Sequence, residues 1–130
     1  MERRRMKAFL DTHAAVFLWE GRGELFGTAS RELLERGLLH LSPLVRLELG
    51  YLREVGKLKV EPEQILGTLT GDYGVTVTAD PLDRLIPLAM PLAWTRDPFD
   101  RLLVATALLH EAPLITRDAR IQEHFAGAVW

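Results

Sequence analysis

The chain has 130 residues, a formal net charge of −2 at pH 7 and no cysteine. The length predicts one domain spanning residues 1–130, and the missing thiols exclude disulfides, zinc–thiolate sites and cysteine nucleophiles. The small negative charge excludes a global attraction to nucleic acid, so any such contact must come from a local patch.

The chain begins with a basic segment that contains Arg3, Arg4 and Arg5. No long apolar segment follows it, so it does not have the pattern of a secretion signal. The apolar stretch at residues 85–94 is interrupted by prolines and is too short to span a bilayer. We therefore expect residues 1–5 to be a flexible basic tail and the protein to be cytoplasmic, without membrane association.

Short apolar runs alternate with helix-like segments, which favours βαβ units and a mainly parallel sheet in an α/β fold. In chain order, the predicted elements are a strand at 7–10, a helix at 12–19, a helix ending at 36, a strand at 38–41, a helix at 43–55, a helix from 62 to about 71, a strand at 75–78, a helix from 81, a helix at 98–110, a strand at 114–116, a short helix after 118 and an edge strand at 128–130.

A polar residue followed by proline marks the start of three of these helices. The pairs are Ser42-Pro43, Asp80-Pro81 and Asp97-Pro98. The first residue can cap free helix N–H groups, and proline at the first helical position lacks an N–H that would be unpaired there anyway. For the helix ending at residue 36, Thr28 or Ser30 is the expected cap.

The helix predicted at 43–55 carries an acid within an apolar stripe. Positions i, i+3, i+4, i+7, i+8 and i+11 are Leu44, Leu47, Glu48, Tyr51, Leu52 and Val55. We expect this face to be buried, which would place Glu48 among apolar residues rather than in solvent. Arg46 and Arg53 stand at spacings that do not face Glu48, so neither is well placed to pair with it.

Three further acids interrupt or end apolar runs. Asp11 and Asp118 each follow a predicted strand, and parallel neighbours would place both at the edge of the sheet where ligands bind. Asp97 and Asp100 both stand at one helix start. One acid is enough to satisfy the free N–H groups there, so we interpret Asp97 as the structural cap and Asp100 as functional.

Repulsion among clustered carboxylates points to a divalent cation. Two carboxylates 5 Å apart repel by about 3 kcal/mol at an effective dielectric constant near 20, a large share of the stability of a small domain. Oxygen-only ligands suit Mg²⁺ or Mn²⁺. The four histidines show no metal-ligand spacing, and His13 is interpreted as a local hydrogen-bonding or packing residue.

Four segments together carry a resemblance to a known family. They are Phe9–His13, Ser42–Leu49, Arg96–Ala107 and Leu114–Asp118. In this order they resemble the PIN-domain nucleases, particularly the VapC-type toxins of toxin–antitoxin modules. The resemblance implies a three-layer α/β/α sandwich with a central, mainly parallel sheet. It also implies a homodimer and inhibition by a cognate antitoxin protein.

The resemblance further implies an Mg²⁺- or Mn²⁺-dependent endoribonuclease that hydrolyses RNA phosphodiesters. The implied catalytic and metal-binding residues are Asp11, Glu48, Asp100 and Asp118. Asp97 belongs to the same motif without being one of these four acids. Thr12 and Thr116 flank two of the acids and are expected to hydrogen-bond the carboxylates or a water at the metal.

Four arginines stand beside the acids in sequence and could contact RNA phosphates, because a guanidinium forms bidentate bonds to phosphate. They are Arg46, Arg96, Arg101 and Arg117. For each one, a solvated surface position or an ion pair with a nearby acid is the alternative.

Rival functions remain open at this point. The same fold could be a catalytically inactive PIN-like interaction module that binds a protein partner. A phosphatase with Asp11 as nucleophile would need a second acid two residues later, where the chain has His13. A DNA-binding antitoxin-like role is disfavoured because no basic recognition helix is evident.

Overall fold

The computed structural model describes residues 5–130, and all strand pairs in this range are parallel. The strand order is β3-β2-β1-β4-β5. The strands are β1 (Lys7–Leu10), β2 (Leu38–Leu41), β3 (Thr76–Val77), β4 (Leu114–Ile115) and β5 (Ala128–Val129). The basic tail expected over residues 1–5 lies, apart from Arg5, outside the described residues.

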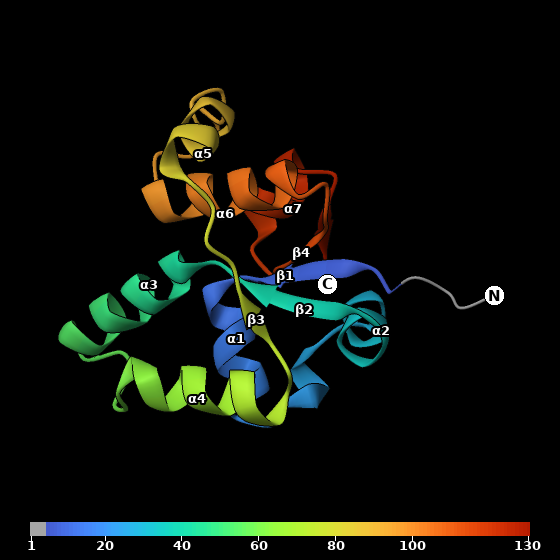
Figure 1. Cartoon of the computed structure of the whole chain (residues 1–130), viewed down its shortest axis with the longest axis vertical. Helices are drawn as coiled ribbons and strands as arrows, with labels where there is room; N and C mark the ends of the chain where they lie inside the picture. Colours follow the sequence, from blue (N-terminus) through green and yellow to red (C-terminus); the bar gives the residue numbers. More distant parts are fainter. Residues whose placement is uncertain (1–4) are drawn as a thin grey trace.

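Helices cover both faces of the sheet and confirm the predicted three-layer α/β/α sandwich (Figure 1). The helices are α1 (Thr12–Trp19), η1 (Gly23–Leu25, a 3-10 turn), α2 (Thr28–Arg36), α3 (Pro43–Glu54), α4 (Pro62–Asp72), α5 (Leu82–Ala89), α6 (Pro98–Leu109) and α7 (Ala119–His124). In Figure 1, α1, α2 and α4 lie below the sheet and α5, α6 and α7 lie above it. Helix α3 contacts α1, α4 and α6. Within residues 5–130, no helix is both long enough and apolar enough to cross a membrane.

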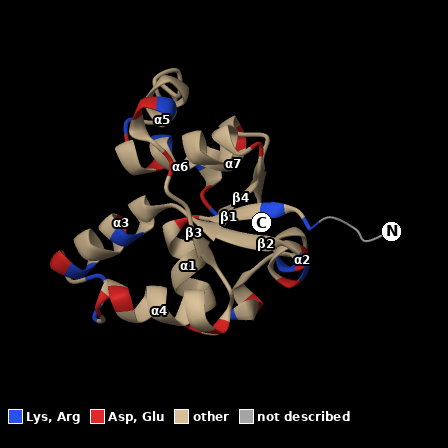
Figure 2. Cartoon of the chain, in the orientation of Figure 1, with Lys and Arg blue, Asp and Glu red and all other residues tan. Residues whose placement is uncertain are grey.

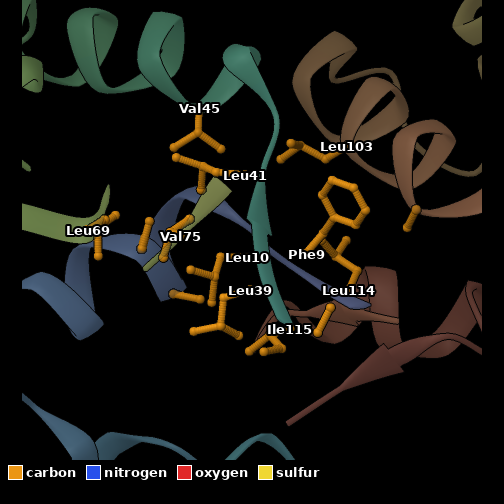
Figure 3. Packing of buried hydrophobic residues seen from close by; sticks show 14 of the residues in the cluster. Phe9, Leu10, Leu39, Leu41, Val45, Leu69, Val75, Leu103, Leu114 and Ile115 are labelled. Atoms are coloured by element: carbon orange, nitrogen blue, oxygen red, sulfur yellow. The ribbon is translucent and has the colours of Figure 1, made fainter. Parts of the chain in front are cut away.

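The central strands are buried on both faces, as expected for a parallel sheet covered by helices. Phe9 and Leu10 of β1 are at most 1% exposed. Figure 3 shows Leu10 on the side of Leu69 and Val75, whereas Phe9 lies on the side of Leu103. The apolar residues of β1 therefore contribute to the core on both faces of the sheet.

The strand order reverses direction at β1, which pairs with β2 on one side and β4 on the other. The chain moves outward from β1 to β2 and β3, then returns to build β4 and β5 on the opposite side. A crevice forms at the carboxyl ends of strands where such a reversal occurs. The Asp11 N–H donates to the Ile115 carbonyl at 3.1 Å, which ties the end of β1 to the end of β4 at this place.

The expected burial of the α3 stripe is confirmed only in part, because Leu44, Glu48 and Leu52 are half-buried and the other three members are exposed. Leu47, Tyr51 and Val55 are 63%, 54% and 48% exposed, whereas Val45 and Leu49 are fully buried. The helix carries apolar residues on two faces, and its packing against α4 and α6 selects the face that contains Val45. Periodicity alone could not choose between the two faces.

The expected cap of α2 is also wrong. Gly27 is the N-cap, and it provides no side-chain cap. A side chain at Gly27 would lie 2.6 Å from the Trp130 carbonyl oxygen, so only glycine fits there. Ser30 lies inside the helix, where its N–H donates to that same oxygen at 2.9 Å.

Asp80 does not cap α5, contrary to the expectation from the Asp80-Pro81 pair. Pro81 occupies the N-cap position, without a side-chain cap. The Asp80 Oδ1 atom instead lies 2.8 Å from His110 Nε2, at the end of α6. The two helix starts predicted from Ser42 and Asp97 are confirmed, because both side chains accept N–H groups of the first turn.

Candidate active site at the carboxyl ends of β1 and β4

A cleft of about 310 Å³ lies beyond the carboxyl ends of β1 and β4. Its walls come from α1, α3, α6, α7 and the connections that precede them. The lining residues are Asp11, Thr12, His13, Glu48, Asp97, Asp100, Leu103, Arg117, Asp118 and Ile121. The four acids singled out in the sequence therefore line one cleft, together with Asp97.

Asp11 is the most buried of these acids, with 7% of its surface exposed. It caps α1, because its Oδ1 atom accepts the Ala14 N–H at 2.8 Å. Burial raises the pKa of the Asp11 carboxyl, and hydrogen bonds from Thr116 and the Ala14 N–H oppose that rise. The helix cap fixes the carboxylate in place at the floor of the cleft.

Glu48 is half-buried on α3 and is bonded to α1. The hydroxyl of Thr12, itself buried, donates to Glu48 Oε1 at 2.5 Å. Burial raises the pKa of the Glu48 carboxyl, the bond from Thr12 lowers it, and the negative charge of Asp97 raises it further. Glu48 does not cap a helix, so this side-chain hydrogen bond between α1 and α3 is what orients its carboxylate.

Asp97 and Asp100 stand at the start of α6. Asp97 Oδ1 accepts the Phe99 N–H at 2.9 Å and the Asp100 N–H at 3.5 Å, so Asp97 is the cap. Burial, followed by the negative charges of Asp97, Asp118, Glu48 and Asp11 in that order, raises the pKa of the Asp100 carboxyl to about 7. All the other acids of the cleft therefore act on Asp100 electrostatically.

Asp118 caps α7, because its Oδ1 atom accepts the Ile121 N–H at 2.9 Å. Its own N–H donates to the hydroxyl oxygen of Thr116 at 3.1 Å. Thr116 is fully buried, and its hydroxyl lowers the pKa of the Asp11 carboxyl. One threonine at the end of β4 thus connects the acids that follow the two central strands.

The donor set fits a hard divalent cation such as Mg²⁺ or Mn²⁺, because every acidic ligand in the cleft is a carboxylate oxygen. Asp11, Asp97 and Asp118 each use one oxygen as a helix cap, and Asp100 accepts no hydrogen bond within residues 5–130. In the same range, no three acids or histidines are already gathered closely enough to hold an ion. The cleft therefore provides suitable ligands without a preformed coordination shell.

The four arginines predicted to contact phosphate have different surroundings. Arg46 donates from Nε to Glu63 at 2.6 Å, on the outer side of α3. Arg101 donates from Nε to a backbone carbonyl in the connection before α6, at 2.8 Å. Arg96 is exposed outside the cleft lining, whereas Arg117 lies in the lining itself.

Two features of the cleft were not anticipated from the sequence. His13 is exposed and lines the cleft rather than packing in the fold. Arg117 lies over the rings of Phe17 and Trp130, with its guanidinium carbon 4.7 Å and 5.9 Å from the ring centroids. The two rings are far apart in sequence, and no local pattern connects them.

A larger groove, of about 1200 Å³, lies between α2, the end of α6 and the connection before β5. Its walls are mainly apolar, and it includes Leu33, Leu108 and Phe125. It shares no lining residue with the acidic cleft. The clustered carboxylates, not the size of the cavity, identify the candidate active site.

The raised pKa of Asp100 predicts how stability depends on pH in metal-free protein. The folded state holds a proton on Asp100 up to about pH 7, whereas the unfolded chain loses it near 3.8, so the contribution of Asp100 falls as pH rises through this window. The free energy of unfolding of Asp100→Asn relative to the wild type should rise by about 2 kcal/mol between pH 4 and 7, less than the full shift implies because the side chain is partly open to water.

Urea unfolding in EDTA at several pH values measures this difference. Asp72→Asn, which alters an exposed acid at the end of α4, is the matched control and should show no such trend. A difference for Asp100→Asn that is flat, or that falls with pH, would contradict the crowding of acids around Asp100.

A family model described as the PIN domain matches residues 8–127. Over 118 residues, the chain is 28% identical to Ribonuclease VapC22 of Mycobacterium tuberculosis, covering 88% of this chain and 89% of that protein. Among solved structures, a toxin–antitoxin complex from Klebsiella pneumoniae contains a chain with a TM-score of 0.68 and 19% identity. VapBC2 from Rickettsia felis bound to a promoter DNA fragment has a TM-score of 0.65 and 16% identity. Both alignments cover 95% of this chain and 96% of the other, and the match over residues 8–127 shows that the chain belongs to the PIN domain family.

Proposed function

We propose that this protein is a metal-dependent endoribonuclease that hydrolyses RNA phosphodiesters as the toxin of a type II toxin–antitoxin pair. The observation that carries the proposal is the shared cleft of Asp11, Glu48, Asp100 and Asp118 in a PIN domain. The name of the mycobacterial relative, a ribonuclease, supports RNA as the substrate. Cleavage of RNA would place the activity in the cytoplasm.

In this proposal Asp11 and Asp100 would hold the cation directly. Glu48 and Asp118 would hold a second ion or orient the attacking water. A bound Mg²⁺ or Mn²⁺ lowers the pKa of water and offsets negative charge on the phosphate. The expected products carry a 5′-phosphate and a 3′-hydroxyl.

The protein's own contribution is to hold the acids in place. Asp11 and Asp118 are fixed as helix caps, and Thr12 holds Glu48. Asp100 is the acid whose charge changes, because a pKa of about 7 leaves its carboxyl partly protonated at neutral pH. A bound cation favours the charged form. The walls of Leu103 and Ile121 add an apolar side to the cleft.

The proposed partner is a cognate antitoxin protein. Solved neighbours of similar fold, from Klebsiella pneumoniae, Rickettsia felis and Salmonella typhimurium, are toxin–antitoxin or VapBC complexes. The second candidate is a catalytically inactive PIN-like module that binds a protein partner. The presence of all four acids in one cleft favours the nuclease.

We also propose that the protein is a homodimer that associates through exposed apolar residues of α3 and α5. They are Leu47 and Tyr51 of α3 with Val55 at its C-cap, and Leu82 and Ile86 of α5 with Met90 at its C-cap, with exposures between 45% and 67%. Each set repeats at intervals of four residues, so each forms a stripe along its helix. In Figure 1, α5 lies at the top, above α6, and α3 lies lower, at the left. Large exposed apolar surface of this kind is typical of an association site.

Asp11→Asn and Asp100→Asn should each lower RNA cleavage by about 100-fold or more, because each removes a charged ligand. Cleavage of a labelled single-stranded RNA is measured with Mg²⁺, with Mn²⁺ and with EDTA. Asp72→Asn is the control and should retain activity. Circular dichroism shows whether each variant is folded. Full activity in EDTA would exclude a metal mechanism, and a folded wild type without any cleavage would favour the inactive module.

Mg²⁺ or Mn²⁺ should raise the melting temperature, because a ligand that binds only the folded state stabilises it. A tenfold excess over Kd corresponds to about 1.4 kcal/mol, or roughly 4 °C for a domain of this size. Calorimetry of the wild type and of Asp11→Asn, with and without the ion, measures the effect. An equal shift in both proteins would place ion binding outside the cleft.

Leu47→Glu combined with Ile86→Glu should convert a dimer to a monomer, because two charges would be buried without partners. The dimer dissociation constant should rise at least about 30-fold, as measured by sedimentation equilibrium. Tyr73→Glu, at the end of α4 and 43% exposed, is the control. Unchanged dimers in the double variant would exclude this face as the interface.

A further inference from the structure

Among the four arginines that stand near the acids in sequence, Arg117 is the one that lines the acidic cleft, whereas Arg96 is exposed outside that lining. Arg46 is paired with Glu63, and Arg101 is bonded to backbone carbonyls. Arg117 is bonded to neither an acid nor a carbonyl within residues 5–130, where the arginine ion pairs involve Arg22, Arg36, Arg46 and Arg53. It nevertheless lines a cleft that holds five carboxylates.

Aromatic rings hold Arg117 in this position. Its guanidinium carbon lies 4.7 Å from the centroid of Phe17 on α1 and 5.9 Å from that of Trp130, just beyond β5. Phe26 stacks on Trp130 at 4.8 Å, and the Trp130 carbonyl accepts the Ser30 N–H of α2. The support therefore combines three separate segments of the chain and is itself anchored to a helix.

A cation on an aromatic face keeps its hydrogen-bonding capacity. The ring interacts with the flat face of the guanidinium, and the N–H groups at its edge stay available. Their planar fork matches the geometry of a phosphate, to which arginine forms two parallel bonds. Arg117, a residue of the cleft lining without an ion pair among residues 5–130, therefore keeps its edge N–H groups for an anion from outside the protein.

The acidic cleft needs such a group to receive a polyanion. Five carboxylates repel phosphate, and the net charge of the chain is −2. Figure 2 shows basic and acidic residues interspersed over the outer helices rather than gathered in one basic face. Attraction must therefore come from cations at the cleft itself, namely the divalent ion of the proposed function and a basic side chain of the lining.

We propose that Arg117 is the phosphate-binding residue of the cleft, and that Phe17 and Trp130 are the positioning residues that hold it there. Arg117 binds a backbone phosphate of the RNA chain that lies across the cleft. The inference rests on the proposed ribonuclease function and names the residue that receives the substrate.

Arg117→Met removes the charge and keeps a side chain of similar length. With single-stranded RNA in EDTA, where cleavage stops, Kd should rise about tenfold or more. The slope of log Kd against log salt should fall by about 0.7, the value for one phosphate contact on a single strand. In Mg²⁺ or Mn²⁺, KM should rise by a similar factor with kcat within about threefold. Fluorescence anisotropy and initial rates measure these quantities.

Three further variants separate the roles. Arg36→Met removes the same charge from α2, outside the cleft, and should leave Kd, salt slope and KM unchanged. Arg117→Lys keeps the charge but not the fork, so it should keep the salt slope and bind RNA more weakly than the wild type. Phe17→Leu keeps the arginine and removes one ring, so KM should rise while the salt slope stays at the wild-type value.

The outcomes distinguish the failure of this inference from the failure of the proposed function. If the wild type cleaves RNA and Arg117→Met behaves like Arg36→Met, the role of Arg117 is overturned and the ribonuclease function stands. If Phe17→Leu matches the wild type in KM, the positioning role of the rings is overturned. A wild type that neither binds nor cleaves RNA overturns both the function and the inference.

Discussion

Repulsion among carboxylates held in one partly buried cleft is the constraint on which the rest of the structure depends. Two carboxylates that lie 5 Å apart repel each other by about 3 kcal/mol at an effective dielectric constant near 20. The fold limits this cost by giving most of the acids a structural bond. Asp11, Asp97 and Asp118 cap α1, α6 and α7, so the N-termini of three helices converge on the cleft and place partial positive charge around it. The same arrangement that tolerates the acids without a cation fixes their positions for binding one.

The topology explains why these helix starts meet. In a parallel sheet the chain leaves every strand at the same edge, so the helices that follow β1 and β4 both begin there. The reversal of strand order at β1 opens the crevice between the two starts. Thr116, just after β4, accepts the Asp118 N–H and lowers the pKa of the Asp11 carboxyl. Helices α3 and α6 then complete the walls with Glu48 and Asp100.

The sequence predicted most of the elements and the meeting of the four acids in one cleft, because the signals for both are local. Strand runs, the Ser42 and Asp97 caps and the position of acids at strand ends each depend on a few neighbouring residues. Prediction failed where distant parts of the chain decide the outcome. Which apolar face of α3 is buried depends on α4 and α6, and Asp80 bonds a histidine thirty positions away instead of capping α5. The aromatic support of Arg117 likewise joins segments that meet only in the folded chain.

The hydrogen bond from Thr12 to Glu48 connects the position of α3 to the geometry of the acidic cleft. Glu48 lies between the buried side of that helix and its exposed apolar residues. Helix α3 therefore carries both an acid of the cleft and an outward-facing apolar surface. Any partner that tilts or shifts α3 must also change the distances between the Glu48 carboxylate and the three acids that cap helices. Assembly on the outside of the molecule and alignment of the carboxylates inside it are therefore mechanically linked through one helix.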